Sequence, residues 1–340
     1  MSETQELIPG LPEEIALECM TRFHYSTHQA AAGVCCRWRE LLRSKDFYLH
    51  RKQSGHTDKA VCFVQAIQVR PGTDGCKPVE TTSFGVSMFD PVSGKFDWLG
   101  SIPKYPDGIP LFCQLTSSEG KLVIMGGWNP ASYEPVNDVF VYDFTTKQWK
   151  EGEEMPDTRS FFAAGEYAGK ILIAGGHDEN KNALCSAFAY DPRSDRWCEL
   201  PPMCQDRDEC QAFVMGSEFL VVSGYGSDNQ GNFETSADSY NIETGRWRRM
   251  ENVWERGQCP RSCTGLGKDG KLFSWAEHEA AVRVGTCAVD LNGSTILFGS
   301  PYQGEAQGFY IVNRQNRKLE KTAVRDGFQG LVQTGCSVEI

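Results

Sequence analysis

The chain has 340 residues, of which 40% are hydrophobic and 23% charged, and its formal net charge is −11 at pH 7. This composition is typical of a folded globular protein, and the negative charge argues against a nucleic-acid or acidic-membrane partner. No apolar run approaches the roughly 18 residues of a membrane span, and the N-terminus shows no basic-then-apolar secretory pattern.

Residues 1–50 are predicted to form a small helical module. Leu11-Pro12-Glu13-Glu14 opens a helix, because proline is tolerated in a first turn and early acids suit the positive helix end. A second helical run, from Ala30 to Leu42, carries apolar side chains at helix spacing. Two or three short helices cannot bury a stable core alone. We therefore expect the module to pack against the rest of its own chain or against a partner protein.

After the module, the pattern changes from helix to strand. Residues 51–58 are polar and are predicted to be a short link, and 59–340 form the second domain. Lys59 to Val69 begins as a strand, and residues 70–82, rich in Gly, Pro and Asp, are predicted to be a long surface loop. Phe84 to Asp90 and Phe96-Asp97-Trp98 then form the outer half of a unit that recurs downstream.

Three complete copies of that unit follow. Each has a pair of small residues, then a tyrosine, then a tryptophan seven residues later: Gly126-Gly127, Tyr142, Trp149; Gly175-Gly176, Tyr190, Trp197; and Ser223-Gly224, Tyr240, Trp247. The tyrosines are 48 and 50 residues apart, and a period near 50 with four short strands per unit is typical of a kelch β-propeller. In the middle copy the predicted strands are 161–167, 170–174, 187–191 and 196–199. The fold class is therefore mainly β, a propeller preceded by a small all-α module.

Blade number and ring closure follow from the repeat length. Residues 59–340 hold nearly six repeats, so six blades are favoured over five. The pattern decays after Trp247, and only 24 residues separate Trp275 from Gly299, so either one blade is truncated or there are five blades and an insertion. Phe328 to Val338 is a strand without successors. We predict that it closes the ring by joining the N-terminal blade, which lacks its own first strand.

Two motifs that could carry chemistry have simpler interpretations. Gly265, Gly267 and Gly270 match a dinucleotide fingerprint, but a strand rather than a helix follows them, which favours a hairpin turn. His24 and His28 have the spacing of a helical metal site, but no third ligand lies nearby. No Ser–His–Asp or Cys–His grouping is identifiable. We expect no catalytic site, no metal and no cofactor.

The 14 cysteines are scattered, many within apolar strand patterns. Disulfide frameworks belong to short secreted chains, so buried thiols in a reducing compartment are the simpler interpretation. The sequence thus predicts a cytoplasmic or nuclear protein.

A binding face is predicted where loops of successive blades converge around the channel. Arg159, Arg207 and Arg261 precede the first strand of successive units, with Arg261 displaced later, and could present forked donors to carboxylate or phosphate. The loops after the glycine pairs contribute further candidates: Trp128, His177 and Tyr225. The alternative is that each arginine pairs with an acidic neighbour and braces its loop, and that Trp128 and Tyr225 are buried.

Two stretches of the helical module carry a family resemblance. Leu-Pro-Glu-Glu-Ile at 11–15 and Val-Cys-Cys-Arg-Trp-Arg-Glu-Leu-Leu at 34–42 resemble the F-box, by which ubiquitin-ligase substrate receptors dock on a Skp-type adaptor. Cysteines at 19, 35 and 36 depart from the residues common there but keep the face apolar. The resemblance implies that six residues contact the adaptor: Leu11, Pro12, Ile15, Val34, Cys35 and Trp38. The alternative is that they only pack against one another or the propeller.

An F-box followed by kelch repeats resembles the plant kelch-repeat F-box family, whose members are substrate receptors of Skp–cullin–F-box ligases. The subgroup it resembles is associated with turnover of phenylalanine ammonia-lyase, and hence phenylpropanoid control, and with response regulators of cytokinin signalling. The resemblance implies a non-catalytic adaptor that binds a Skp adaptor, through it a cullin, and one such target. Two rivals stay open: a ligase-independent scaffold, which would bind no Skp adaptor, and a kelch-type propeller enzyme, which would need metal or acid–base residues in its channel.

Overall fold

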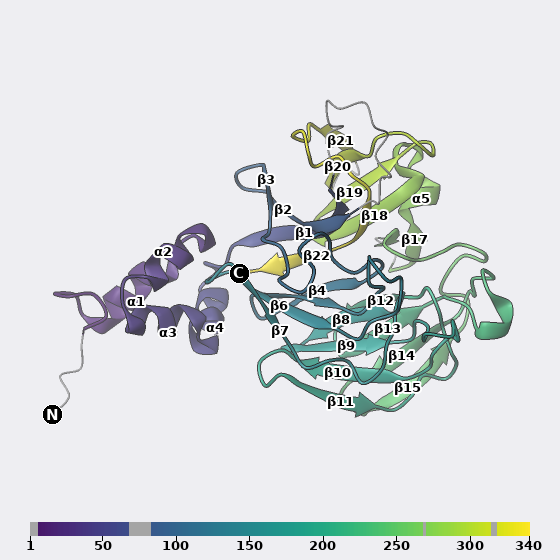
Figure 1. Cartoon of the computed structure of the whole chain (residues 1–340), viewed down its shortest axis with the longest axis horizontal. Helices are drawn as coiled ribbons and strands as arrows, with labels where there is room; N and C mark the ends of the chain where they lie inside the picture. The colour runs from purple at the N-terminus through teal and green to yellow at the C-terminus, as the bar shows by residue number, and fades with distance from the viewer. Residues whose placement is uncertain (1–5, 68–82, 268–269, 314–317) are drawn as a thin grey trace.

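The computed structural model describes residues 6–67, 83–267, 270–313 and 318–340. It consists of a small helical module beside a ring of β-sheets, and the module adjoins the ring next to the C-terminus (Figure 1). The loop predicted for residues 70–82 lies outside the described residues. No helix in the described part of the chain is long and apolar enough to cross a bilayer.

The module is built from short helices around a small core. Its elements are α1 (Glu13–Thr21), the 3-10 turn η1 (Tyr25–Thr27), α2 (His28–Ala32), α3 (Cys36–Arg43) and α4 (Lys45–Gln53). The buried apolar residues that these elements share are Leu7, Ala16, Met20, Ala31, Ala32, Leu42 and Phe47. A core of this size needs support from outside, as the sequence predicts.

The second predicted helix is in fact two helices. Gly33 follows the end of α2, and Cys35 has extended backbone and caps α3, because its thiol accepts a hydrogen bond from the Trp38 amide at 3.4 Å. A cap of this kind restarts a helix after a break in the chain. The single run from Ala30 to Leu42 is therefore corrected to α2 and α3.

Helix α4 is absent from the sequence prediction. Ser44 caps it, since the hydroxyl of Ser44 accepts from the Phe47 amide at 3.1 Å. The helix continues to Gln53 and covers the first three residues of the predicted 51–58 link. Only residues 54–58 therefore connect the module to the ring.

The described residues of the ring form five four-stranded antiparallel sheets and one two-stranded sheet. The first sheet contains β22 (Val332–Glu339), β1 (Lys59–Ala66), β2 (Phe84–Asp90) and β3 (Lys95–Trp98); the second β4 (Gln114–Ser118), β5 (Lys121–Met125), β6 (Val139–Asp143) and β7 (Gln148–Glu151). The third contains β8 (Ala163–Tyr167), β9 (Lys170–Ala174), β10 (Ala187–Asp191) and β11 (Arg196–Leu200). The fourth contains β12 (Gln211–Met215), β13 (Glu218–Val222), β14 (Ala237–Asn241) and β15 (Arg246–Met250), and the last β18 (Val284–Leu291), β19 (Ser294–Ser300), β20 (Gly308–Asn313) and β21 (Leu319–Thr322).

The sixth position of the ring holds only a hairpin. β16 (Thr264–Leu266) and β17 (Leu272–Ser274) pair with each other, and the short helix α5 (Trp275–His278) follows. The central channel, about 370 Å³, is lined by the inner strand of each full blade and, at this position, by Thr264. Of the two alternatives for this region, the structure shows the truncated blade. The described chain therefore has five complete blades rather than six. The glycine motif forms this hairpin, with Lys268 and Asp269 outside the described residues.

The C-terminal strand closes the ring, as predicted. β22 pairs antiparallel with β1, and Cys336 lies opposite Cys62 in the register. The buried amide of Gln65 donates to the carbonyls of Phe328 at 2.8 Å and Gly330 at 3.1 Å, which fixes the entry to β22. The closure leaves no unpaired edge on β1.

The tyrosine and tryptophan of each complete repeat lie opposite one another on the two outer strands of a blade. Each indole N–H also donates to a carbonyl at the exit of the preceding blade: Trp149 to Gly100 at 2.6 Å, Trp197 to Glu153 at 2.9 Å and Trp247 to Pro201 at 2.6 Å. The repeat spacing therefore encodes a bond between neighbouring blades. In the first blade the position belongs to Phe96, which lies opposite Phe89, while Trp98 stacks on Phe328.

The glycine pairs make room for the neighbouring loop. A Cβ on Gly175 would lie 2.6 Å from the Arg207 carbonyl, and one on Gly176 would lie 2.4 Å from the Ser160 carbonyl. Both glycines also have positive φ, at 71° and 83°. A side chain at Gly175 or Gly176 would displace the backbone of a neighbouring loop, so this pair fixes how the adjacent blades meet.

Candidate functional site

The first candidate surface is apolar and lies on the helical module. Leu11, Ile15 and Val34 are 36%, 51% and 63% exposed. Pro12 is exposed as well and stands at the N-cap of α1 with φ −53° and ψ 145°. Large apolar side chains this exposed, on a module whose other apolar residues form a core, mark an interaction surface.

The other two predicted adaptor residues, Cys35 and Trp38, are half-buried. Trp38 donates its indole N–H to the Leu7 carbonyl at 2.6 Å and packs on Phe23 with ring centroids 6.0 Å apart. An ion pair between Glu13 and Arg37 joins the start of α1 to α3. The structure thus holds the 11–15 and 34–38 segments together, with four of the six predicted side chains exposed and two bracing them.

The second candidate surface is the loop face of the propeller, at the end of the ring opposite the helical module. The module contacts the hairpin turns, where Thr145 Oγ donates to the Leu42 carbonyl at 3.5 Å and Gln29 Nε2 to the Thr146 carbonyl at 3.3 Å. The glycine pairs stand at the other ends of the same strands. The loops with the predicted target-binding residues are therefore free of the module.

Two of the three predicted arginines are fully buried there. Arg159 makes a bidentate ion pair with Asp157 at 2.6 and 2.7 Å, and its guanidinium lies over the ring of Phe188. Arg207 pairs with Asp238 at 2.7 Å rather than with an acid next to it in sequence. Both guanidiniums also donate to backbone carbonyls and a serine hydroxyl of the following loop. For these two arginines the structure shows the bracing alternative.

Arg261 occupies a different place because its register is shifted by one residue. A residue with positive φ recurs at the tip of four loops: Phe112, Phe161, Glu209 and Ser262. Arg261 precedes this tip by one residue, whereas Arg159 and Arg207 precede it by two. The residue is half-buried, and its guanidinium carbon lies 4.2 Å from the Phe161 ring centroid and 5.8 Å from that of Phe112. Among the described residues it makes no hydrogen bond or ion pair.

The residues after the glycine pairs form one hydrogen-bonded chain across three blades. Trp128 donates its indole N–H to Ser160 Oγ at 2.8 Å, Ser160 Oγ lies 2.8 Å from His177 Nε2, and His177 Nδ1 lies 2.8 Å from Asp208 Oδ2. Tyr225 donates to Glu209 at 3.0 Å. The His177 ring stacks on Phe161 with centroids 5.2 Å apart.

This chain has the order of a Ser–His–Asp relay, which the sequence spacing does not reveal. Ser160 is wholly buried and its hydroxyl is capped by Trp128, so the relay joins three loops and presents no nucleophile at the surface. An alignment of the repeats would reveal this relay, because Ser160 and Asp208 occupy one equivalent position of the repeat and His177 and Trp128 occupy another. The sequence also misses the half-buried rings of Phe112 and Phe161, which carry Arg261.

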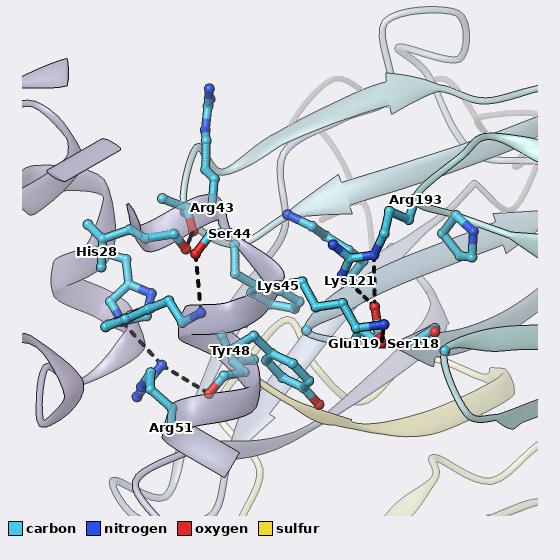
Figure 2. A pocket seen from close by; sticks show the side chains of 18 residues that line it. His28, Arg43, Ser44, Lys45, Tyr48, Arg51, Ser118, Glu119, Lys121 and Arg193 are labelled. Carbon is cyan, nitrogen blue, oxygen red and sulfur yellow. Dashed lines mark hydrogen bonds and ion pairs between the residues drawn. The ribbon is translucent and has the colours of Figure 1, made fainter. Parts of the chain in front are cut away.

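The joint between module and ring lies between the two candidate surfaces and contains a buried arginine. Arg51 is 2% exposed and donates to Ile340 O at 3.1 Å and to Asp58 Oδ2 at 3.1 Å. Its remaining donors reach backbone carbonyls of the module and linker: Thr21, Phe23 and His56. Arg51 also lies 3.2 Å from His28, and Figure 2 shows the two side chains next to each other among the helices of the module. Burial, and then the charge of Arg51, lowers the pKa of His28 to about 4.

Comparison with known proteins matches both halves of the chain. Residues 8–50 match the F-box domain family, and residues 111–156 and 158–203 match the Kelch motif. The solved structure titled "Structure of YjhT" covers 74% of this chain and 81% of its own at a TM-score of 0.47 and 14% identity, too distant to inform on function.

Full-length relatives are found in Arabidopsis thaliana. The F-box/kelch-repeat protein At1g15670 is 34% identical over 359 residues, which cover 98% of this chain and all of the relative. The F-box/kelch-repeat protein At1g80440 is 37% identical over 362 residues, with the same coverage. The chain therefore belongs to the plant F-box/kelch-repeat protein family.

Proposed function

We propose that this protein is the substrate receptor of a Skp–cullin–F-box ubiquitin ligase. The observation that carries the proposal is the exposure of Leu11, Ile15 and Val34 on a module whose core holds most of its other large apolar side chains, buried or partly buried. An apolar surface of this kind suits the groove of a Skp-type adaptor, and the adaptor would in turn connect the protein to a cullin. The family is one of non-catalytic adaptors, so the receptor supplies proximity rather than an acid, base or nucleophile.

The target is proposed to dock on the loop face of the propeller. Arg261 supports this, since an unpaired guanidinium on two half-buried rings offers a forked donor to a carboxylate or phosphate of a target. Trp128, His177 and Tyr225 contribute by holding the loops in register. Arg159 and Arg207 are assigned the bracing role.

The identity of the target is proposed on resemblance alone. The expected target is phenylalanine ammonia-lyase or a cytokinin response regulator, in the cytoplasm or nucleus. Proximity labelling with the full chain and with the Arg261→Gln variant would identify the proteins that need this side chain. Loss of the same target with both Arg261→Gln and Phe161→Ala is expected.

Adaptor binding is tested by placing a charge on the exposed apolar surface. Ile15→Lys loses the burial of one large aliphatic side chain and desolvates an ammonium, so we expect about 100-fold weaker binding to a Skp adaptor or more. Val34→Lys should act alike. Both side chains are exposed, so thermal stability should stay unchanged.

Val92→Lys is the matched control, because this valine is 85% exposed but lies on the turn between β2 and β3. It should bind the adaptor as the unchanged protein does. If all three variants bind the adaptor equally, or the unchanged protein does not bind it, the ligase-independent scaffold is the correct reading.

A further inference from the structure

We infer that the mouth of the propeller channel on the loop face binds a target segment in which an acidic side chain stands a few residues from an aliphatic one. This chemistry deepens the proposed function and rests on it, since the target is taken to dock on the loop face. Three features of the mouth support it: a loop tip contributed by the first blade, an exposed apolar arc, and an unpaired guanidinium beside that arc.

The loop tip of the first blade is Leu331. In the fourth sheet, Gln211 follows its tip by two residues, and its side-chain oxygen accepts from the amide of the next tip, Ser262, at 3.1 Å. Both residues line the channel. Gln333 makes the same contact in the first sheet, because its side-chain oxygen accepts from the Phe112 amide at 3.0 Å. Leu331 precedes Gln333 by two residues, so it occupies the tip position next to Phe112.

Apolar groups form a continuous arc along this side of the mouth. Leu331 is 47% exposed, and its Cδ1 lies so close to Gly285 that a Cβ on that glycine would be 2.9 Å away. Val284, next to Gly285 in the chain, is 37% exposed. Phe112 continues the arc on the other side of Leu331 and stacks on Phe161 with ring centroids 4.7 Å apart. Exposed apolar groups gathered in this way favour an apolar side chain of a partner.

Arg261 adds a positive charge to this arc. Its guanidinium carbon lies 4.2 Å from the Phe161 ring centroid, and it has no hydrogen bond or ion pair among the described residues. Burial lowers the pKa of this guanidinium, while nearby acidic groups, Cys259 and Glu209 among them, act in the opposite direction. A cation that has lost part of its water and has no acceptor is stabilised when a carboxylate of the target pairs with it.

A carboxylate suits this place better than a phosphate. Glu209 is the loop tip that precedes Ser262 around the mouth, and its carboxylate accepts from the Tyr225 hydroxyl at 3.0 Å and from the Cys259 thiol at 3.7 Å. It therefore remains a negative charge near Arg261 without pairing with it. A phosphate dianion would be repelled by Glu209 about twice as strongly as a singly charged carboxylate, which can still accept from both prongs of the guanidinium.

The test begins with the selection of random peptides, displayed on phage, by the full-length chain. We expect the enriched peptides to share an Asp or Glu a few residues from Leu, Ile, Val or Met. A synthetic peptide with this consensus is then measured by fluorescence anisotropy. Replacing its acid by the amide and changing Arg261→Gln should each weaken binding about tenfold, with no further loss when the two are combined. Leu331→Ser should also cost about tenfold but keep the preference for the acid.

Arg196→Gln and Met215→Ser are the matched controls. Arg196 is exposed on β11, and Met215 is 41% exposed at the end of β12 that lies away from the loop face. Both variants should bind the peptide as the unchanged protein does. The amide peptide leaves the protein itself untouched, so it tests the pairing even where a variant is less stable.

Enriched peptides without a shared acid, or an acid whose replacement costs as much in Arg261→Gln as in the unchanged protein, would overturn the inference. Tighter binding of the same peptide with phosphoserine in place of the acid would do so too, as would dimers in sedimentation that Arg261→Gln dissociates, since these would assign the mouth to a second copy of the chain. No enrichment, with Skp-adaptor binding intact, would sink this inference alone. Loss of the ligase role would instead appear as absent adaptor binding beside an unchanged peptide result.

Discussion

Arg51 donates from one buried position to carbonyls of the helical module and to the last residue of the ring, so Arg51→Met should loosen both domains at once. The guanidinium donates to the carbonyls of Thr21, Phe23, His56 and Ile340 and to the Asp58 carboxylate. Removing one partner of a buried ion pair typically costs about 3–5 kcal/mol. Methionine fills similar volume, so packing changes little and we expect a loss of about 4 kcal/mol.

Hydrogen exchange by mass spectrometry is the assay, because it reports each element separately. A loss of about 4 kcal/mol corresponds to roughly a 700-fold faster exchange through local opening. The acceleration should appear both in α4, which carries Arg51, and at the end of β22, which carries its acceptor Ile340. Arg51→Lys keeps the positive charge beside Asp58 but loses the forked donors of the guanidinium. Its exchange rates should therefore lie between those of the unchanged protein and those of Arg51→Met.

Arg196→Met serves as the control and should change exchange nowhere beyond its own strand. The reasoning is refuted if α4 exchanges faster while β22 does not, since Arg51 would then stabilise only the module. A change below about 1 kcal/mol in both would refute it too, because a surface pair contributes no more than that.

Two further predictions concern His28 and the glycine pairs. The pKa of His28 lies near 4 in the folded chain and near 6.5 when unfolded, so the unfolded chain binds the extra proton and stability should fall as pH drops from about 6.5 to 4. His28→Gln should remove about 3 kcal/mol of that fall, measured by denaturant unfolding at several pH values, and parallel curves for both proteins would contradict this. Gly176→Ala should cost about 3 kcal/mol or more, because its Cβ would lie 2.4 Å from the Ser160 carbonyl. Gly231→Ala has a similar φ of 79° but open space around it and should cost about 1–2 kcal/mol; equal midpoints for both would show that backbone angle alone matters.

Local pattern was enough to place the strands of the regular blades. Lys170–Ala174 and Ala187–Asp191 are predicted and observed with the same bounds, because the alternation of side chains and the flanking glycines are properties of a few adjacent residues. The closure by the C-terminal strand was also predictable, since a blade without a first strand needs one from elsewhere. α4 escaped notice because its cap is one serine and its sequence is largely polar.

The direction of the arginines could not be predicted in the same way. Arg207 pairs with Asp238, which lies 31 residues away, so the choice between a buried brace and an exposed donor is made by a contact that spacing does not encode. The longer spacing before Arg261 was visible, but it did not reveal the one-residue shift relative to the loop tip, and the surroundings of Arg261 depend on the rings of Phe112 and Phe161 in two other blades. Candidate binding residues on repeat proteins are therefore best compared at aligned positions.

Because β1 pairs with β22, the ring cannot close until the ribosome has synthesised the last strand of the chain. A ribosome adds about 5–20 residues per second, so the strand that begins at Lys59 waits on the order of tens of seconds for the partner that ends at Glu339. Throughout that interval the anchoring arginine of α4 lacks its final acceptor, Ile340, and the nascent ring is open. A message truncated before codon 332 would thus yield a chain in which β1 lacks its partner β22 and Arg51 lacks its acceptor at Ile340.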